Sequence, residues 1–178
     1  MSATQAQLKN HFLNLGNQGA LYVWGANGQI ITKELMNMLY KTFGSNTYNR
    51  AYYDNKLKAG KGKPGADCSG AICPVSKYDT TAAGYYNRCK QKGTISTLPK
   101  NQICLVFKTN SKGVINHVGC YTGDGYVSEM ASSQTNYQRK ALAGNGWDLW
   151  GMPDFISNPE TVQGAVATSG TTYNKIEG

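Results

Sequence analysis

Apolar side chains recur at helical spacing in the first quarter of the chain. Leu8, Phe12 and Leu15 lie three or four positions apart, which predicts an amphipathic helix over residues 4–14 that stops near Gly16. The same spacing returns further along, so a second helix is predicted over residues 32–43 with Thr32 as its N-cap. A short aromatic run, LYVWG, occupies residues 21–25 between the two helices.

The helical period is then lost. Residues 45–65 are rich in Tyr, Asn, Lys and Gly, which predicts a long loop with at most a helical turn at residues 52–58. Beyond a Pro-Gly turn at residues 64–65, residues 67–72 are expected to open a short helix. A longer helix is predicted over residues 80–92, closed by Gly93.

Strand-like patterns dominate the second half of the chain. Residues 103–108, 117–122 and 126–130 are short β-rich runs, and the Asp-Gly pair at residues 124–125 signals a hairpin between the last two. A fourth short strand is expected near residues 147–150. Helices first and an antiparallel meander afterwards predict an α+β domain.

Length and composition set the expected domain boundaries. The 178 residues suffice for one domain with a substantial core. Beyond residue 156 few large apolar side chains remain, and Ser, Thr and Gly are frequent. We therefore expect residues 1–156 to form the folded domain and residues 157–178 to form a linker or flexible tail.

The formal charge of +8 bears on which kinds of molecule the protein binds. Such a charge fits either a solvated face or attraction to a polyanion. The basic stretch at residues 56–63 contains Gly and lacks interleaved aromatic residues, so nucleic acid is not expected as a partner. No run of 18 apolar residues occurs and the first ten residues are polar, so neither membrane insertion nor a signal peptide is expected.

Cysteine and histidine usage argues against a metal site. The five cysteines form no Cys-x-x-Cys pair and the chain has only two histidines, so neither a metal nor another cofactor is expected. An odd number of cysteines without a signal sequence argues against a disulfide framework. One reactive thiol among several buried ones is the simplest account. His11, in the first predicted helix, is interpreted as a solvated surface residue.

Cys68 is the candidate nucleophile. It lies where a loop enters the short helix predicted at residues 67–72. The helix dipole and free backbone N–H groups are therefore expected to lower the pKa of its thiol and to stabilise an oxyanion. The small neighbours Ser69 and Gly70 would let a substrate approach closely. A buried structural cysteine is the alternative interpretation.

His117 is the candidate base. It is the only histidine in the strand-rich half, and a cysteine hydrolase needs a base from a distant segment. Glu129 lies on the predicted hairpin partner, roughly opposite His117 and at an even offset, so the two side chains can share a face. There a carboxylate would orient the imidazole. An ordinary exposed strand glutamate fits the hairpin geometry equally well.

These segments resemble the signature blocks of a known family. The sequences YVWG at residues 22–25, DCSG at 67–70 and HVGCYTGDG at 117–125 resemble three blocks of NlpC/P60 cysteine peptidases, in the same order. WDLWG at residues 147–151 resembles the ending of phage lysins in that group, and the resemblance spans about residues 20–156. It implies a papain-like α+β fold with N-terminal helices on a small antiparallel sheet, and cleavage of peptidoglycan stem peptides. It assigns Cys68 as nucleophile and His117 as base.

The resemblance also suggests residues that bind substrate. Tyr22 would lie beside the thiol and hydrogen-bond in the active site, and Asp67 and Ser69 would line the substrate cleft. Trp24 is a further candidate. Core packing is as good an interpretation for Tyr22 and a better one for Trp24. The third polar position of the family falls on Glu129, where a His, Asn or Gln is frequent.

Residues 26–66 depart from the family pattern. Family members commonly have a short gap between the first two blocks, whereas this chain has the predicted helix and loop there. We expect this insertion to build one wall of the cleft near the nucleophile. Tyr48, Tyr52 and Tyr53 would either contact peptide or glycan, or pack the insertion onto the core.

Together these features predict the catalytic domain of a phage-type endolysin. It would be made in the host cytoplasm and act on bacterial peptidoglycan after release, with a C-terminal wall-binding module that this chain lacks. The scissile bond would lie in the stem peptide or cross-bridge, or would be the amide cut by an N-acetylmuramoyl-L-alanine amidase. Both reactions would pass through a thioester. A non-catalytic wall-binding module would have lost Cys68 or His117, and a cysteine acyltransferase remains a third class.

Overall fold

Helices come first and the main sheet follows in the computed structural model of the protein, which describes residues 2–157. The helices are α1 (Gln5–Asn17), α2 (Lys33–Phe43), α3 (Arg50–Gly60), α4 (Cys73–Ser76) and α5 (Ala82–Asn87), with 3-10 turns η1 (Gly70–Ile72) and η2 (Ile95–Thr97). The strands are β1 (Leu21–Tyr22), β2 (Asn27–Ile30), β3 (Pro64–Ala66), β4 (Gln91–Thr94), β5 (Cys104–Thr109), β6 (Ile115–Tyr121), β7 (Tyr126–Ser132), β8 (Asn136–Ala141) and β9 (Leu149–Met152). This arrangement confirms the predicted α+β class.

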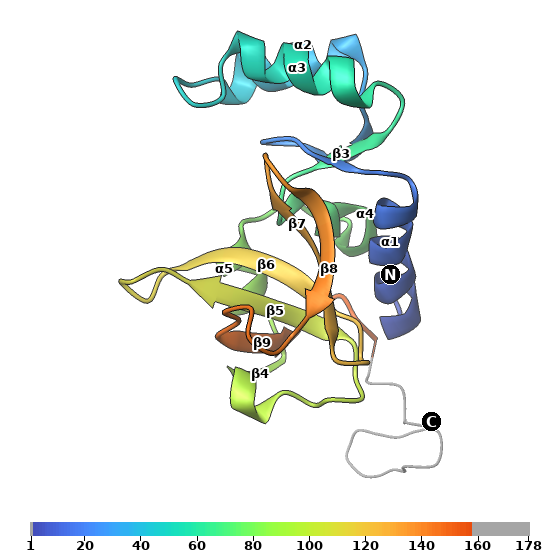
Figure 1. Cartoon of the computed structure of the whole chain (residues 1–178). Helices are drawn as coiled ribbons and strands as arrows, with labels where there is room; N and C mark the ends of the chain where they lie inside the picture. Colours follow the sequence, from blue (N-terminus) through green and yellow to red (C-terminus); the bar gives the residue numbers. More distant parts are fainter. Residues whose placement is uncertain (1, 158–178) are drawn as a thin grey trace.

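The main sheet carries the larger hydrophobic core. Its strand order is β4-β9-β5-β6-β7-β8, and every neighbouring pair is antiparallel. The amphipathic helix α1 packs against β6, β7 and β8, where Leu8 and Phe12 are fully buried (Figure 1). Its start is as the sequence predicts, because the Thr4 hydroxyl accepts from the backbone N–H of Gln7 at 3.0 Å in a capping box.

Two strands of this sheet were not expected from the sequence. The helix predicted over residues 80–92 ends earlier, because residues 91–94 pair with β9 as strand β4. Strand β8 lies in a polar segment without strand-like alternation, and it forms by pairing with β7. The hydrogen bonds offered by a neighbouring strand outweigh local preference at both places.

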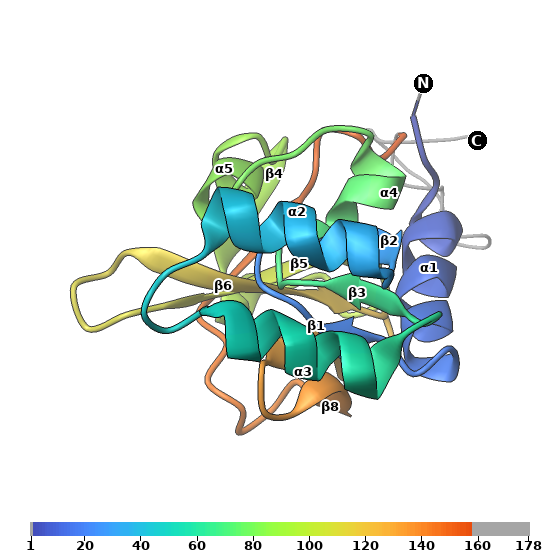
Figure 2. The same ribbon diagram turned by 90° about the horizontal axis from the view of Figure 1, so that it is seen from above.

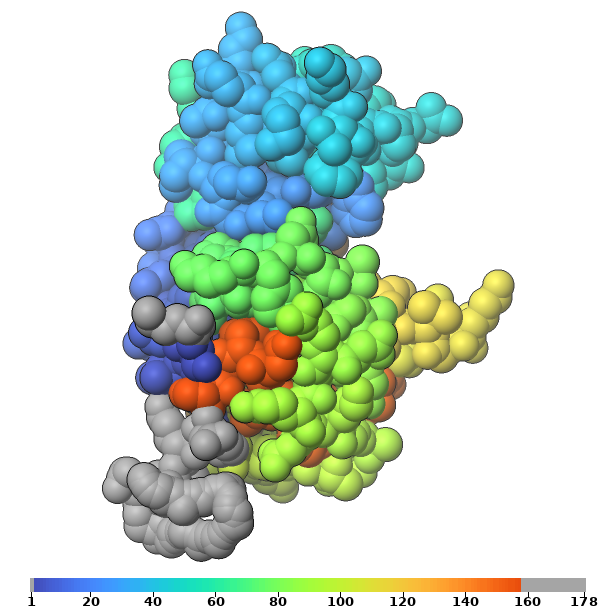
Figure 3. Space-filling view, turned by 180° about the vertical axis from the view of Figure 1, so that it is seen from behind, coloured from blue at the N-terminus to red at the C-terminus, as the bar shows by residue number. Residues whose placement is uncertain are grey.

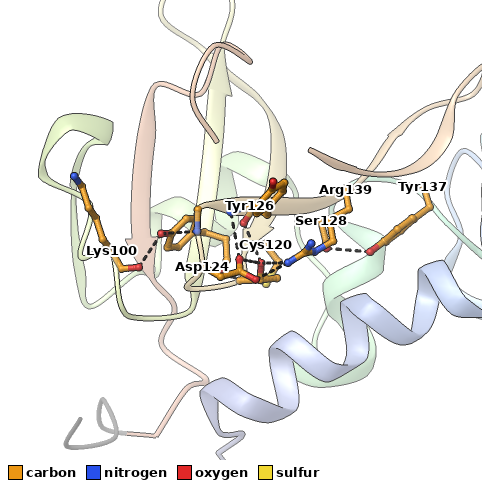
Figure 4. A network of polar contacts seen from close by, with 10 residues as sticks. Lys100, Cys120, Asp124, Tyr126, Ser128, Tyr137 and Arg139 are labelled. Carbon is orange, nitrogen blue, oxygen red and sulfur yellow. Dashed lines mark hydrogen bonds and ion pairs between the residues drawn. The ribbon is translucent and has the colours of Figure 1, made fainter. Parts of the chain in front are cut away.

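A network of polar side chains connects β8 with the turn between β6 and β7 (Figure 4). Arg139 on β8 bonds the carboxylate of Asp124 in the β6–β7 turn at 2.6 Å. The hydroxyl of Tyr121 accepts from the N–H of Gly125 at 3.1 Å, and the hydroxyl of Tyr137 donates to Ser128 at 3.0 Å. The predicted hairpin turn is therefore confirmed, and side chains from β6 and β8 hold it in place.

Strand β1 separates two cores. It pairs in parallel with β3, and β2 pairs antiparallel with β3, so a small three-stranded sheet adjoins the main one. Successive residues of a strand point to opposite faces. Tyr22 accordingly joins the main core, whereas Leu21 and Val23 join a second core with the insertion.

The insertion contains two helices. The predicted long loop over residues 45–65 is wrong, because the helical turn suggested at residues 52–58 is part of the longer helix α3. Asn49 caps α3 by accepting the N–H of Tyr52 at 3.0 Å, and the face with Tyr53 and Lys56 is buried. Figure 2 shows α2 and α3 side by side over the small sheet, and Figure 3 shows them as a distinct lobe. Tyrosine and lysine obscured the helical period in the sequence because both usually face solvent, at least in part.

The two ends of the described region meet. The N–H of Ala3 donates to the carbonyl of Phe155 at 2.8 Å, and the N–H of Ser157 donates to the carbonyl of Ala3 at 2.8 Å. The predicted tail over 157–178 therefore begins with one bonded residue, and residues 158–178 lie outside the described residues. Within residues 2–157, no helix is long and apolar enough to cross a membrane.

Gly70 provides a test of the packing around the Cys68 turn. A Cβ on this residue would lie 1.9 Å from the carbonyl oxygen of Ala26, a backbone atom that cannot rotate away. We expect Gly70→Ala to lower the free energy of unfolding by about 2–3 kcal/mol and Tm by roughly 5–10 °C, measured by calorimetry. Gly113→Ala is the control, because it combines a φ of 75° with open space and should cost about 1 kcal/mol. Equal effects of the two changes would contradict the proposed clash.

Candidate active site

The turn that carries Cys68 is built around Asp67. Its Oδ1 accepts from the N–H of Gly70 at 2.7 Å and its Oδ2 accepts from the N–H of Gly25 at 3.0 Å. Burial raises the pKa of Asp67, while these two hydrogen bonds favour the carboxylate. Asp67 therefore joins the turn after β3 to the turn between β1 and β2.

The environment of the Cys68 thiol differs from the sequence expectation. Burial, followed by the Asp67 carboxylate, raises its pKa to about 11, although the backbone N–H groups of Val118, Ser69 and Cys68 itself act in the opposite direction. The expected lowering by a helix dipole is wrong, because η1 has only three residues and a short helix sums few peptide dipoles. The thiol lies next to β6 and keeps its proton at neutral pH.

His117 and Glu129 meet as a hydrogen-bonded pair. Nε2 of His117 lies 2.6 Å from Oε1 of Glu129, and the two side chains are 15% and 6% exposed. Since Cys120 pairs with Ser128, continuing the register places Glu129 across from Gly119, diagonal to His117 instead of directly opposite it. The expected shared face is present. A carboxylate only accepts hydrogen bonds, so Nε2 carries the proton and Nδ1 is left with a free lone pair.

Trp147 packs against one face of the His117 imidazole, a contact that the sequence does not indicate. Its ring stacks on that of His117 with centroids 5.6 Å apart and planes at 25°. Trp147 is buried and occupies the space beside Gly119, where a Cβ would lie 2.9 Å from the indole. The ammonium of Lys108 lies 4.7 Å from the centre of the Trp147 ring. The WDLWG motif is the one sequence feature that marks Trp147. The second tryptophan of this motif, Trp150, instead donates to the hydroxyl of Thr97 at 2.9 Å.

The second histidine is not a solvated surface residue as the sequence suggested. Nε2 of His11 donates to the carbonyl of Ala71 at 2.7 Å, which ties α1 to the segment after Cys68. Burial lowers the pKa of His11. Helical periodicity places a residue on a face but does not reveal which loop covers that face.

Cys68 and His117 line one open cleft of about 800 Å³. Tyr22, Trp24, Asp67 and Ser69 line it too, whereas Glu129 does not. The insertion contributes one wall of this cleft, through Phe43, Thr47, Tyr48 and Tyr52. The remaining walls come from residues 79–82, 115–117 and 131–134.

The two aromatic residues of the YVWG block have different environments. Tyr22 is buried and lines the cleft together with Cys68, and burial raises the pKa of its hydroxyl, which therefore stays protonated. Trp24 is 38% exposed, so the interpretation of Trp24 as a core residue is wrong. Its ring stacks on Tyr48 instead.

The side chains that usually bind metal ions, those of His, Cys, Asp and Glu, do not cluster around a common point in the part of the chain that the structure describes. Residues 2–157 contain no group of three His, Cys, Asp or Glu side chains arranged to hold one. All five cysteines are free thiols.

The raised pKa of Cys68 predicts a pH profile for alkylation. Only the thiolate reacts with iodoacetamide, so the rate at Cys68 should rise about tenfold per pH unit from pH 7 to pH 10. Peptide mapping by mass spectrometry separates Cys68 from the half-buried Cys73. A rate at Cys68 that is already constant between pH 6 and pH 8 would contradict a protonated resting thiol.

Comparisons with known proteins identify the fold. No protein-family model and no curated protein matches the sequence. Among solved structures, the NlpC/p60 domain of the peptidoglycan hydrolase SagA matches with a TM-score of 0.50 and 16% identity, over 84% of this chain and 98% of that one.

Two further structures match less well. NlpC2 from Trichomonas vaginalis gives a TM-score of 0.46 at 16% identity, over 80% of this chain and 46% of that one. The peptidoglycan hydrolase RipB from Mycobacterium tuberculosis gives 0.40 at 16% identity, over 85% and 84%. Because both scores are below 0.5, the assignment rests on the SagA domain, over nearly its whole length. The chain has the α+β fold of an NlpC/P60 domain.

Proposed function

We propose that this domain is a peptidoglycan hydrolase that cleaves a peptide or amide bond by cysteine nucleophilic catalysis. One observation carries the proposal: Cys68 and His117 line the same cleft, and His117 is held by a buried carboxylate 2.6 Å from its Nε2. A thiol, an imidazole and an orienting group are the parts that an acyl-transfer site of this type needs.

The first step would transfer the thiol proton. With Nε2 bonded to Glu129, Nδ1 is the nitrogen of His117 that can accept the proton from Cys68. The sulfur then attacks the substrate carbonyl carbon, and the imidazolium is stabilised by the carboxylate of Glu129. Because the resting thiol is protonated, proton transfer and attack would occur together.

The oxyanion that forms would be stabilised by donors at the nucleophile turn. The backbone N–H of Cys68 and the protonated hydroxyl of Tyr22 are the candidates. When the C–N bond breaks, the leaving amine takes the proton from His117 and a thioester to Cys68 remains. His117 then removes a proton from water, whose attack releases the new carboxylate and restores the thiol.

Peptidoglycan is proposed as the substrate on two grounds. The domain shares its fold with the NlpC/p60 domain of a peptidoglycan hydrolase, and its net charge of +8 favours approach to an anionic wall. The cleft is open and its volume of about 800 Å³ lies in the range of ligand-binding sites. A role as a phage endolysin, made in the host cytoplasm and acting after release with a wall-binding module, is part of this proposal.

The alternatives differ in what they require of the site. A non-catalytic wall-binding module has no need for a thiol, an imidazole and a buried carboxylate in one place, so the geometry favours an enzyme. A cysteine acyltransferase would use the same groups with an amine as acceptor in place of water. Product analysis distinguishes these acceptors.

Digestion of purified peptidoglycan tests the proposal. The wild-type protein should release fragments with new amino and carboxyl ends, which mass spectrometry assigns to one bond. Cys68→Ala should lower the rate by at least roughly 10³-fold, because the nucleophile is lost. Cys73→Ala is the matched control and should keep activity, since Cys73 lies outside the cleft lining. Undiminished digestion by Cys68→Ala would exclude this mechanism.

Glu129 is tested separately. Glu129→Gln keeps the shape of the side chain but removes the charge that stabilises the imidazolium, so we expect kcat to fall roughly 10–100-fold with little change in KM. Circular dichroism should show an unchanged fold. If Glu129→Ala retained full activity, another group would have to orient His117.

A further inference from the structure

A stacked aromatic pair, the exposed Trp24 and the half-buried Tyr48, lies in the cleft wall. The rings of Trp24 and Tyr48 are stacked with centroids 4.6 Å apart and planes at 3°, and both line the cleft that contains Cys68. Trp24 is 38% exposed although it follows two buried residues, Tyr22 and Val23. The pair therefore presents apolar ring surface towards solvent inside the cleft, next to the nucleophile.

The backbone of Trp24 is fixed on both sides by the insertion. Its N–H donates to the hydroxyl of Tyr52 at 3.1 Å, and its carbonyl accepts from the hydroxyl of Tyr53 at 3.0 Å. Tyr53 is fully buried. Two adjacent side chains of α3 thus hold one residue of the YVWG block, so the aromatic pair is preorganised and costs little entropy when a ligand binds.

The insertion is also tied to the facing wall. The ammonium of Lys56 is buried and donates to the carbonyl of Ser133 at 2.8 Å and to Oδ1 of Asn136 at 3.0 Å. The Tyr52 hydroxyl lies 3.0 Å from the hydroxyl of Ser133. These bonds connect α3 to the β7–β8 turn, which lines the cleft at residues 131–134, and so hold the two walls at a fixed separation.

Besides the carboxyl groups of Asp67 and Asp79, the cleft that holds the aromatic pair is lined by neutral hydrogen-bonding side chains. Asn27, Thr47, Asn116, Ser132 and Gln134 line the same cleft. Aromatic faces are electron-rich and attract the slightly positive C–H groups of a sugar ring, while amides and hydroxyls match its hydroxyl and acetamido groups. A pyranose presents both an apolar face and a polar edge, which is the combination that this wall offers.

We propose that the Trp24–Tyr48 pair is a sugar-binding subsite that holds an N-acetylated pyranose of the glycan strand beside Cys68. The inference deepens the proposed function and rests on it. Tyr48 and Cys68 line the same cleft, so a ring bound on Tyr48 lies on the side of the site that holds the nucleophile. A sugar on this pair puts the scissile bond near the glycan, which favours the glycan-linked end of the stem peptide over the cross-bridge.

Binding to the inactive Cys68→Ala protein tests this subsite without requiring turnover. The probes are N-acetylglucosaminyl-N-acetylmuramoyl tetrapeptide and the same tetrapeptide without sugar, titrated by calorimetry. We expect the glycopeptide to bind more tightly. Adding Tyr48→Ala should raise its Kd roughly tenfold and so remove most of the preference for the sugar, whereas Tyr48→Phe should retain it.

The matched control is Tyr126→Ala, because Tyr126 is exposed but lies outside the cleft lining. It should leave the ratio of the two Kd values unchanged, and thermal unfolding should confirm that all variants fold. Equal weakening of both probes by Tyr48→Ala, or no preference for the glycopeptide, would overturn the sugar subsite.

The outcomes separate the two proposals. Peptidoglycan digestion by the wild type without a Tyr48-dependent preference for the sugar would leave the hydrolase standing and exclude the subsite. Tyr48-dependent binding of the glycopeptide without digestion would support the subsite and exclude the hydrolase.

Discussion

The site depends on the half-buried carboxylate of Asp67. It accepts the N–H groups of Gly25 and Gly70 and so joins two turns that are far apart in the sequence. Hydrogen bonds to a charged acceptor are worth about 1.5–3 kcal/mol each, and loss of the carboxylate would leave two donors unpaired. The same negative charge, after burial, raises the pKa of the Cys68 thiol. The group that shapes the nucleophile turn therefore opposes a resting thiolate, and this makes the position of His117 decisive in the proposed reaction.

The insertion is part of the site's architecture. It has its own small core, which shares β1 with the main core because Leu21 and Tyr22 point in opposite directions. Its helix α3 bonds the YVWG block on one side and the β7–β8 turn on the other, through Tyr52 and Lys56. Within residues 2–157 no carboxylate pairs with the buried Lys56, and burial lowers the pKa of its ammonium. The rigidity of the cleft wall thus depends on polar contacts that cross between the two cores.

Much of the site could be predicted from the sequence. The parts that could not be predicted have one cause in common, because each depends on a contact with a distant segment. The residue types and order of Cys68, His117 and Glu129 suffice to propose acyl-transfer chemistry, because a hairpin with known turn and parity places His117 and Glu129 on one face. The WDLWG motif marks Trp147, but no local pattern indicates that this residue, which follows β8, stacks on His117. The environment of His11 is hidden in the sequence for a similar reason. Its partner is the backbone carbonyl of Ala71, and every residue carries such a group, so residue type gives no sign of the bond.

The sequence by itself determined the α+β class, the main strands, the first helices and the identity of the chemically active groups, since these follow from local periodicity, turn chemistry and residue type. Only the tertiary structure decided the environment of each group. It made residues 50–60 a helix by burying Tyr53 and Lys56, it raised the pKa of Cys68 where a helix dipole was expected to lower it, and it exposed Trp24. Burial and electrostatic fields depend on segments that are distant along the chain, so no local pattern encodes them.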